Sequence, residues 1–195
     1  MFRIIFALGA ALAALGLSES DAQTTQSDTP PPPALSMGTT ENAPQLGDPY
    51  IGAIIGGWEQ RCVRTVQEQD PCQLYQLLKD TNGNAVSEVT LFKLPAGGQA
   101  VAGATIIVPL ETLLTEQLKV RVDENPARIY PFSFCNSVGC VGRIGLTKDD
   151  IQGFKSGSVA RVSLVPVAAP DQLVILNMSL DGFIAGFDAL IPLQN

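Results

Sequence analysis

Four cysteines are the residues of this chain whose type and spacing could do chemistry, and the chain has no histidine to assist them. Nine residues separate Cys62 from Cys72, and four separate Cys135 from Cys140. A thiol can form a disulfide, bind a metal ion, exchange with another disulfide or act as a nucleophile. Cysteines without histidine partners, behind a leader of the export type, favour the first of these. We therefore expect two structural disulfides.

The other thiol chemistries fit this spacing less well. A zinc site usually takes pairs with about two to four residues between the cysteines, and the first pair is too widely spaced for that. A redox-active pair is typically Cys-x-x-Cys at a helix N-terminus, whereas Cys135 and Cys140 lie between predicted strands. They remain the alternative for a thiol–disulfide exchange protein. A nucleophilic cysteine needs a base, and histidine is absent.

Four cysteines allow three connectivities, and the sequence alone does not choose among them. Local geometry favours a bond within each pair. The polar loop 66–71 separates the predicted strands of Cys62 and Cys72, and a hairpin there would bring the two Cβ atoms to bridging distance. The second pair flanks the turn-like loop 136–139, in which Gly139 is expected to take a positive φ.

No other group of side chains in the sequence indicates a reaction. The absence of histidine excludes Ser-His-Asp triads. Adjacent acids occur at Asp123-Glu124, in a predicted turn, and at Asp149-Asp150, where a helix should begin; solvation and capping explain them better than glycoside hydrolysis. Trp58, the only tryptophan, is expected in the core beside the first disulfide. We predict a non-enzymatic protein with no catalytic residue, metal or cofactor.

Residues 1–22 have the layout of a secretory signal peptide. Arg3 precedes an apolar stretch that ends at Leu17, which is shorter than the roughly 20 residues needed to cross a membrane. We expect cleavage after Ala22 and no stable membrane span in the mature chain. Residues 23–50 are rich in Pro, Ser and Thr and are expected to form a disordered linker.

The charge balance argues against nucleic acid as a partner. The chain carries 12 basic and 19 acidic residues, a net charge of −7, and its lysines and arginines do not cluster along the sequence. Phosphate backbones and anionic membrane surfaces both require such clusters.

Residues 51–195 are expected to form one disulfide-stapled, all-β domain. Four segments carry apolar residues at every second position, so that these share one face, as in half-buried strands: 118–122, 130–134, 162–164 and 174–180. In the second of these, Tyr130, Phe132 and Phe134 should share one face. The segment 105–108 is apolar on both faces and should be central in a sheet. Further strands are expected near 57–65, 72–79, 87–94 and 140–146. This pattern favours a mainly antiparallel β-sandwich or barrel.

Two short helices are expected late in the domain. Thr147 should cap the first helix in a capping box with Asp150, and Gly157 should end it. The second helix should begin near Asp181, pack aromatic residues onto the sheet and stop at Pro192.

A set of short motifs runs in order through about residues 58 to 190. They are Trp58-x₃-Cys62, Cys72-Gln73, Val108-Pro109-Leu110, Leu118-x-Val120-x-Val122-Asp123, Phe132-x-Phe134-Cys135-x₃-Gly139-Cys140 and Ser179-Leu180-Asp181-Gly182-Phe183. Together they resemble the invasion-associated locus B (IalB) family of exported alphaproteobacterial proteins. That family tends to have glycine after Val-Pro-Leu and again a few residues later, where this chain has Glu111 and Glu116-Gln117.

The resemblance implies a periplasmic protein, with outer-membrane association or secretion also compatible, and offers no catalytic residues. We expect it to bind an unidentified envelope or host protein; the family's name member is linked to host-cell invasion. Two other hypotheses stay open. One is a periplasmic thiol–disulfide protein that uses Cys135 and Cys140, and the other is a small-ligand carrier that uses the sandwich interior or a barrel mouth.

Overall fold

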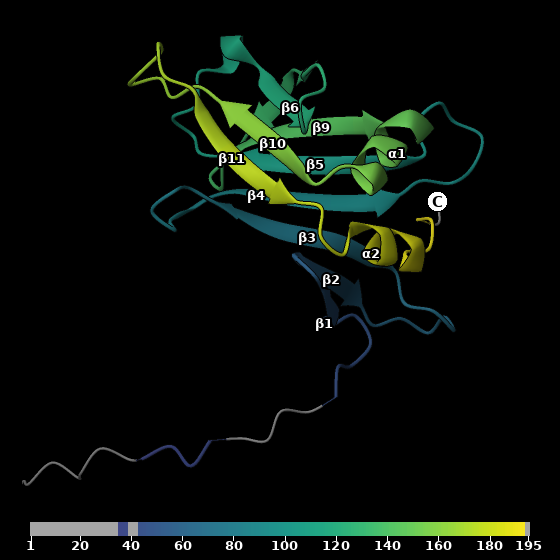
Figure 1. Cartoon of the computed structure of the whole chain (residues 1–195). Coiled ribbons are helices and arrows are strands. Elements are labelled where there is room, and N and C mark those ends of the chain that lie inside the picture. Colours follow the sequence, from purple (N-terminus) through teal and green to yellow (C-terminus); the bar gives the residue numbers. More distant parts are fainter. Residues whose placement is uncertain (1–34, 39–42, 194–195) are drawn as a thin grey trace, which may run out of the picture. The chain divides into compact units, whose positions relative to one another are not determined.

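The computed structural model describes residues 35–38 and 43–193 (Figure 1). All its helices and strands lie in one unit, which spans residues 42–195. The predicted leader, its cleavage site after Ala22 and most of the predicted linker fall outside the described residues. Within the described part, no helix is long and apolar enough to cross a membrane.

Among the described residues, the larger of two antiparallel sheets has seven strands in the order β1-β2-β3-β4-β5-β9-β8. Figure 1 shows β1, β2, β3, β4, β5 and β9 following one another from bottom to top. The segment that is apolar on both faces lies in β5, between β4 and β9, so its predicted place inside a sheet is confirmed. The strand bounds are β1 Pro49–Ile55, β2 Trp58–Val63, β3 Cys72–Lys79, β4 Ala85–Lys93, β5 Ala102–Val108, β8 Phe132–Cys135 and β9 Cys140–Leu146.

The alternation pattern predicts no strand at β1, which begins at Pro49, two residues before the expected start of the domain. Ile51 and Ile54 of this strand are exposed, and the register shifts at Gly52, between Ile51 and Ala53. Because an irregularity of this kind breaks the period of two, the strand leaves no clear alternation in the sequence.

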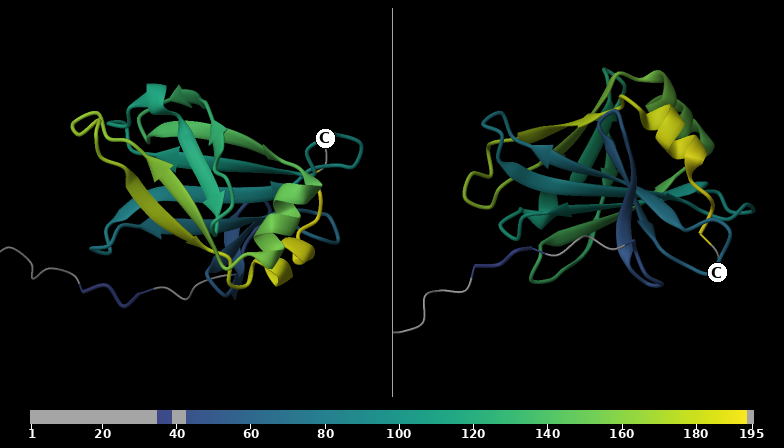
Figure 2. Two further views of the ribbon diagram at one scale, coloured as in Figure 1. Left: turned by 45° about the horizontal axis from the view of Figure 1, so that its top comes forward. Right: turned by 90° about the horizontal axis from the view of Figure 1, so that it is seen from below.

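The smaller sheet has four strands in the order β11-β10-β6-β7. Its residues Leu118, Val162 and Leu176 are fully buried in the core. Figure 2 shows the ribbon of the domain from two further sides. Eleven antiparallel strands in two packed sheets confirm the predicted all-β sandwich. The bounds are β6 Leu118–Val122, β7 Arg128–Tyr130, β10 Val159–Leu164 and β11 Val174–Ser179.

The chain changes sheets at Pro131. Tyr130 ends β7 and pairs with β6 in the smaller sheet, whereas Phe132 begins β8 and pairs with β9 in the larger one. The expectation that Tyr130, Phe132 and Phe134 share one face of a single strand is therefore wrong. Proline has no amide hydrogen to donate to a ladder, which is why one regular strand does not run through this position.

Gln76 of β3 links the two sheets at the free edge of β11. Its side-chain amide donates to the Ser179 carbonyl at 3.1 Å, and its side-chain carbonyl accepts from the Ser179 amide at 2.7 Å. Gln76 is only 8% exposed. This reciprocal pair therefore satisfies backbone groups of the edge strand that water reaches poorly.

Both predicted helices are present: α1 spans Lys148–Ser156 and α2 spans Phe183–Ala189. The capping box of α1 is confirmed. The Asp150 amide donates to the Thr147 hydroxyl at 3.3 Å, and the Thr147 amide donates to the Asp150 carboxylate at 2.9 Å. Gly157 is the C-cap, as expected.

Trp58 joins β2 to α2. It is fully buried, and its ring centroid lies 5.8 Å from that of Phe183, which in turn stacks on Phe187 at 5.6 Å. The prediction that Trp58 packs in the core is confirmed. Its indole N–H meets no acceptor among the described residues, so the contribution of Trp58 comes from packing.

Gln117 has a backbone conformation that is unfavourable for residues with a Cβ atom. It follows the short 3₁₀ helix η1 (Leu114–Glu116) with φ 54° and ψ 166°. This region of conformational space is occupied almost only by glycine, because a Cβ is strained there. Gln117 lies in the stretch where the family that this chain resembles tends to have glycine.

We predict that Gln117→Gly raises the free energy of unfolding by about 0.5–1 kcal/mol. Glycine has no Cβ and so removes the strain in the folded state. It also increases the conformational entropy of the unfolded chain, which offsets part of the gain in stability. Urea denaturation measures the change. Gln117→Ala is the matched control and should shift the value by less than about 0.5 kcal/mol, since alanine keeps the Cβ. A less stable glycine variant would contradict the assignment of strain.

Candidate functional site

Each cysteine pair joins two neighbouring strands of the larger sheet. Cys62 of β2 lies directly opposite Cys72 of β3, and Cys135 of β8 lies directly opposite Cys140 of β9. In both pairs the Cα atoms are 4.0 Å apart and the sulfur atoms are bonded. The structure thus contains the two local pairs that the sequence favours, and the residues it describes include no free cysteine.

The two disulfides differ in their access to solvent. Cys62 and Cys140 are 3% and 1% exposed, and Cys72 is half-buried, but Cys135 is exposed. Cys135 belongs to β8, which is an edge strand. A disulfide that includes an exposed residue is the more accessible one to an external thiolate, so the second disulfide is the one on which an exchange reaction could act.

The hairpin between β8 and β9 is built on Asn136. Its side-chain carbonyl accepts from the amides of Val138 at 2.9 Å and Gly139 at 3.3 Å. The expectation of a positive φ at Gly139 is wrong, since that residue is not among the described glycines with φ above zero. Glycine is needed there because a Cβ would overlap the carbonyl oxygen of Val108 in β5.

One carboxylate organises the loop before Cys72. Asp70 accepts hydrogen bonds from the Tyr50 hydroxyl at 2.6 Å, the Arg64 guanidinium at 2.7 Å and the Thr65 amide at 2.7 Å. The hydrogen bond from Tyr50, followed by that from the Thr65 amide, lowers the pKa of Asp70 below its ordinary value. Because Tyr50 lies in β1, Asp70 ties the edge strand to this loop.

Asp70→Asn should make the stability less sensitive to acid. The folded-state pKa of Asp70 is lowered, so its contribution is present above the unfolded-state pKa of about 4 and is lost as the pH falls through the folded-state value. Urea denaturation at a series of pH values should show that the free energy of unfolding of the variant is below that of wild type at neutral pH. This difference should shrink in acid. Asp171→Asn, on an exposed loop, is the control. A loss that stayed constant with pH would contradict this role.

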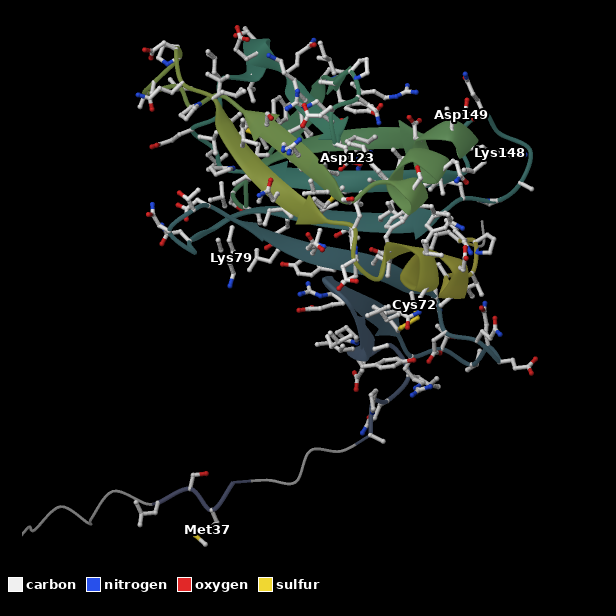
Figure 3. All side chains as sticks on the ribbon, in the orientation of Figure 1. Met37, Cys72, Lys79, Asp123, Lys148 and Asp149 are labelled. Carbon is white, nitrogen blue, oxygen red and sulfur yellow. A yellow bond between two sulfur atoms is a disulfide. The ribbon has the colours of Figure 1, made fainter. Side chains whose placement is uncertain are left out.

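The adjacent acids have structural partners. Asp150 closes the capping box and pairs with Arg128 of β7 at 2.7 Å. Asp123 accepts from the amides of Ser158 and Val159, each at 3.1 Å. Figure 3 shows Asp123 and Asp149 away from each other and from Cys72. Over the described ranges, no three Cys, Asp or Glu side chains are grouped as metal ligands would be.

A cavity of about 150 Å³ lies between β6, β7 and the start of α1. Tyr130 is part of its lining, and burial, followed by the negative charge of Asp150, raises the pKa of Tyr130. Between the two sheets, a cavity of only about 20 Å³ is lined by apolar core residues. That space would hold about one water molecule, and both volumes are below the roughly 300–1,000 Å³ of usual ligand sites. The packed interior therefore gives no support to a carrier of small ligands.

The turn between β1 and β2 packs directly on the backbone before α2. The Gly57 amide donates to the Asp181 carbonyl at 3.1 Å. A Cβ at Gly56 would lie 2.5 Å from the Asp181 oxygen, and one at Gly182 would overlap the carbonyl oxygen of Ile55. The turn that directly precedes the Trp58 motif thus packs on the motif that contains Asp181 and Gly182. The sequence shows the glycines but not that they face each other.

Bulky apolar side chains are exposed at both edges of the larger sheet. In β1, Ile51 and Ile54 are 58% and 65% exposed. At the other edge, Phe134 of β8 is 44% exposed and Val138 of the next loop is 71% exposed. Apolar side chains beside unpaired strand edges are typical of contact surfaces. Sequence reasoning missed this because alternation gives the faces of a strand but not its place in the sheet.

Comparison with known proteins agrees with this fold. The model of the family described as Invasion associated locus B (IalB) protein matches residues 58–191. Among solved structures, invasion associated protein B from Bartonella henselae is similar, with a TM-score of 0.57 and 20% sequence identity over 69% of this chain and 91% of that chain. No curated protein sequence matches. Since the family model covers more than half of the sequence, the chain belongs to the invasion associated locus B family.

Proposed function

We propose that this chain is an exported, non-enzymatic envelope protein that acts by binding another protein. The observation that carries the proposal is the pair of apolar edges of the larger sheet, formed by Ile51 and Ile54 on one side and Phe134 and Val138 on the other. One disulfide joins β2 to β3, beside the edge strand β1, and the other joins the edge strand β8 to β9. A surface that is already rigid loses little conformational entropy when a partner binds.

The proposal places the mature chain outside the cytosol. Residues 1–22 would be removed as a signal peptide, and residues 23–50, the last two of which lie in β1, would form the Pro-rich N-terminal segment of the mature chain. Disulfides persist in the bacterial periplasm and beyond, which supports a periplasmic, outer-membrane-associated or secreted location. A role in host-cell invasion is part of the proposal only for a pathogen. Protease accessibility on intact cells would separate a surface location from a periplasmic one.

Photo-crosslinking in living cells tests the binding function. A photoreactive amino acid at Ile54 or at Phe134 of the full-length chain should give a crosslinked product of one defined mass. Lys148, exposed at the start of α1, is the control position and should give none. The proposal is wrong if neither edge position yields a product, or if the control position yields the same one.

A second candidate, thiol–disulfide exchange, is favoured by one observation, the exposure of Cys135 beside the buried Cys140. Mild reductant followed by thiol labelling decides between the two functions. A structural bridge should stay unlabelled, whereas an exchanging one would be labelled at Cys135 before Cys62 or Cys72 reacts.

A further inference from the structure

The fold brings together three cations that are scattered in the sequence. On β6, Leu118 and Val120 point into the core, so the alternate residues Lys119 and Arg121 lie on the outer face of the smaller sheet. On the neighbouring strand β10, Arg161 is the residue directly opposite Arg121. Lys119, Arg121 and Arg161 therefore form one cationic group, which we call the cationic sheet face.

No carboxylate stands among the outward positions of these fully described strands. Those positions hold Lys119, Arg121, Ile129, Val159, Arg161, Ser163, Ile175, Asn177 and Ser179. Acidic residues stand beyond the two ends of β6, and the guanidinium of Arg161 donates to the backbone carbonyl of one of them, Asp123, at 2.8 Å. Glu116 is 3.8 Å from Lys119, and Glu124, whose side chain is 83% exposed, is 3.3 Å from Arg161. Within the part of the chain that the structure describes, Arg121 has no ion pair.

This arrangement is unfavourable for the isolated domain. Like charges directly opposite each other on neighbouring strands destabilise a sheet. The chain has an excess of acidic residues, with a net charge of −7, yet among the described residues only the exposed Glu124 pairs with Arg161, and no acid pairs with Arg121. An anionic partner would turn the repulsion into attraction, because each guanidinium can bind a carboxylate with two hydrogen bonds.

Exposed aliphatic side chains flank the cations. Ile129, next to Lys119 in the ladder, is 56% exposed, and Ile175, next to Ser163, is 48% exposed. Short β-branched side chains on a rigid sheet suit another polypeptide better than a bilayer, into which long or aromatic side chains insert. Three charges are also few for nucleic acid, where several phosphate contacts are needed.

We propose that the cationic sheet face binds an acidic segment of a partner protein, with carboxylates on Arg121 and Arg161 and apolar side chains on Ile129 and Ile175. The inference rests on the proposed function, since it names the chemistry of a partner, but it concerns a face other than the edges at Ile54 and Phe134. An experiment can therefore contradict binding at the cationic sheet face without contradicting binding at the edges, and the reverse.

The probe is a fluorescent peptide of ten glutamates, added to the purified mature chain and followed by anisotropy. Wild type should bind it at low salt and release it at high salt. Arg121→Glu should weaken binding at least about tenfold. Arg143→Glu, which changes the net charge equally on the outer face of the larger sheet, is the control and should weaken it less than about threefold.

Thermal unfolding shows whether the Arg121→Glu variant is still folded. A carboxylate at position 121 would face Arg161, so the melting temperature of Arg121→Glu should rise by about 1–3 °C while binding falls. Loss of binding together with a gain in stability cannot come from misfolding. Equal binding by wild type and Arg121→Glu would overturn the inference, and so would binding to phosphatidylglycerol vesicles in preference to the peptide.

In cells, a photoreactive amino acid at Asn177, opposite Arg161, should give a product that Arg121→Glu removes and Arg143→Glu leaves. Products at Ile54 or Phe134 with none at Asn177 would overturn this inference alone. Absence of products at all three positions would overturn the proposed function as well.

Discussion

Gly182→Ala is expected to lower the free energy of unfolding by about 3 kcal/mol or more, the largest single effect that we predict. Gly182 has φ 79°, a conformation that costs an alanine about 1–2 kcal/mol. In addition, its Cβ would overlap the carbonyl oxygen of Ile55 and lie 2.6 Å from the carbonyl carbon. Both are backbone atoms, so no side-chain rotation can make room, and the β1–β2 turn must move away from α2.

Urea denaturation followed by the fluorescence of Trp58, the only tryptophan, measures this loss. The matched control is Gly153→Ala in the middle of α1, where an added Cβ meets no atom within 4 Å. That change should instead stabilise the protein by about 0.5–1 kcal/mol, because alanine favours the helix. Similar effects of the two substitutions would show that the turn does not pack on Gly182 as described.

Removing the disulfide between Cys62 and Cys72 by a double Cys→Ala change should lower the free energy of unfolding by about 3 kcal/mol. The two residues are 10 apart in sequence, and the chain-entropy model relates the loss to the length of the closed loop. The shorter separation of 5 between Cys135 and Cys140 predicts a smaller cost, about 2 kcal/mol.

Denaturation with and without reductant provides the check. Reductant should lower the free energy of unfolding of the double variant at Cys62 and Cys72 further, because the second disulfide remains. The variant that lacks all four cysteines should not respond to reductant. If reductant left the unfolding of wild type unchanged, neither pair would be acting as a covalent crosslink.

The sequence predicts the local elements of this fold well because burial leaves a periodic record. Leu118 and Val120 alternate with the polar Lys119 and Arg121, and β6 lies where this alternation predicts a strand. The capping box at Thr147 is equally local, since both of its partners lie within one helical turn. Both features are determined by residues close together in the chain.

Features that depend on the partner of a strand could not be predicted in the same way. The strand β1 lies at an edge and keeps Ile51 and Ile54 exposed, so burial imposes no alternation on it. At Pro131 the aromatic spacing suggests one strand, but the chain crosses between sheets. The proline itself was the available signal, since it cannot donate to a ladder.

The cationic sheet face shows the same limit. Arg121 and Arg161 are 40 positions apart in the sequence, and only the register of β6 against β10 places them side by side. The lysines and arginines do not cluster along the chain, yet three of them do so on the folded surface. Likewise, the fit between Gly182 and Ile55 requires the tertiary structure, although the glycine is visible in the sequence.

Mass spectrometry of the mature protein, isolated from cells without reductant, tests the central claim most directly. We predict a chain that begins after Ala22 and is lighter by four hydrogen atoms than its fully reduced form, one pair for each disulfide. Trypsin should then leave Cys62 and Cys72 in two linked peptides, because Arg64 lies between them, and Cys135 and Cys140 within a single peptide. A cytosolic protein that keeps residues 1–22 and four free thiols would contradict the account.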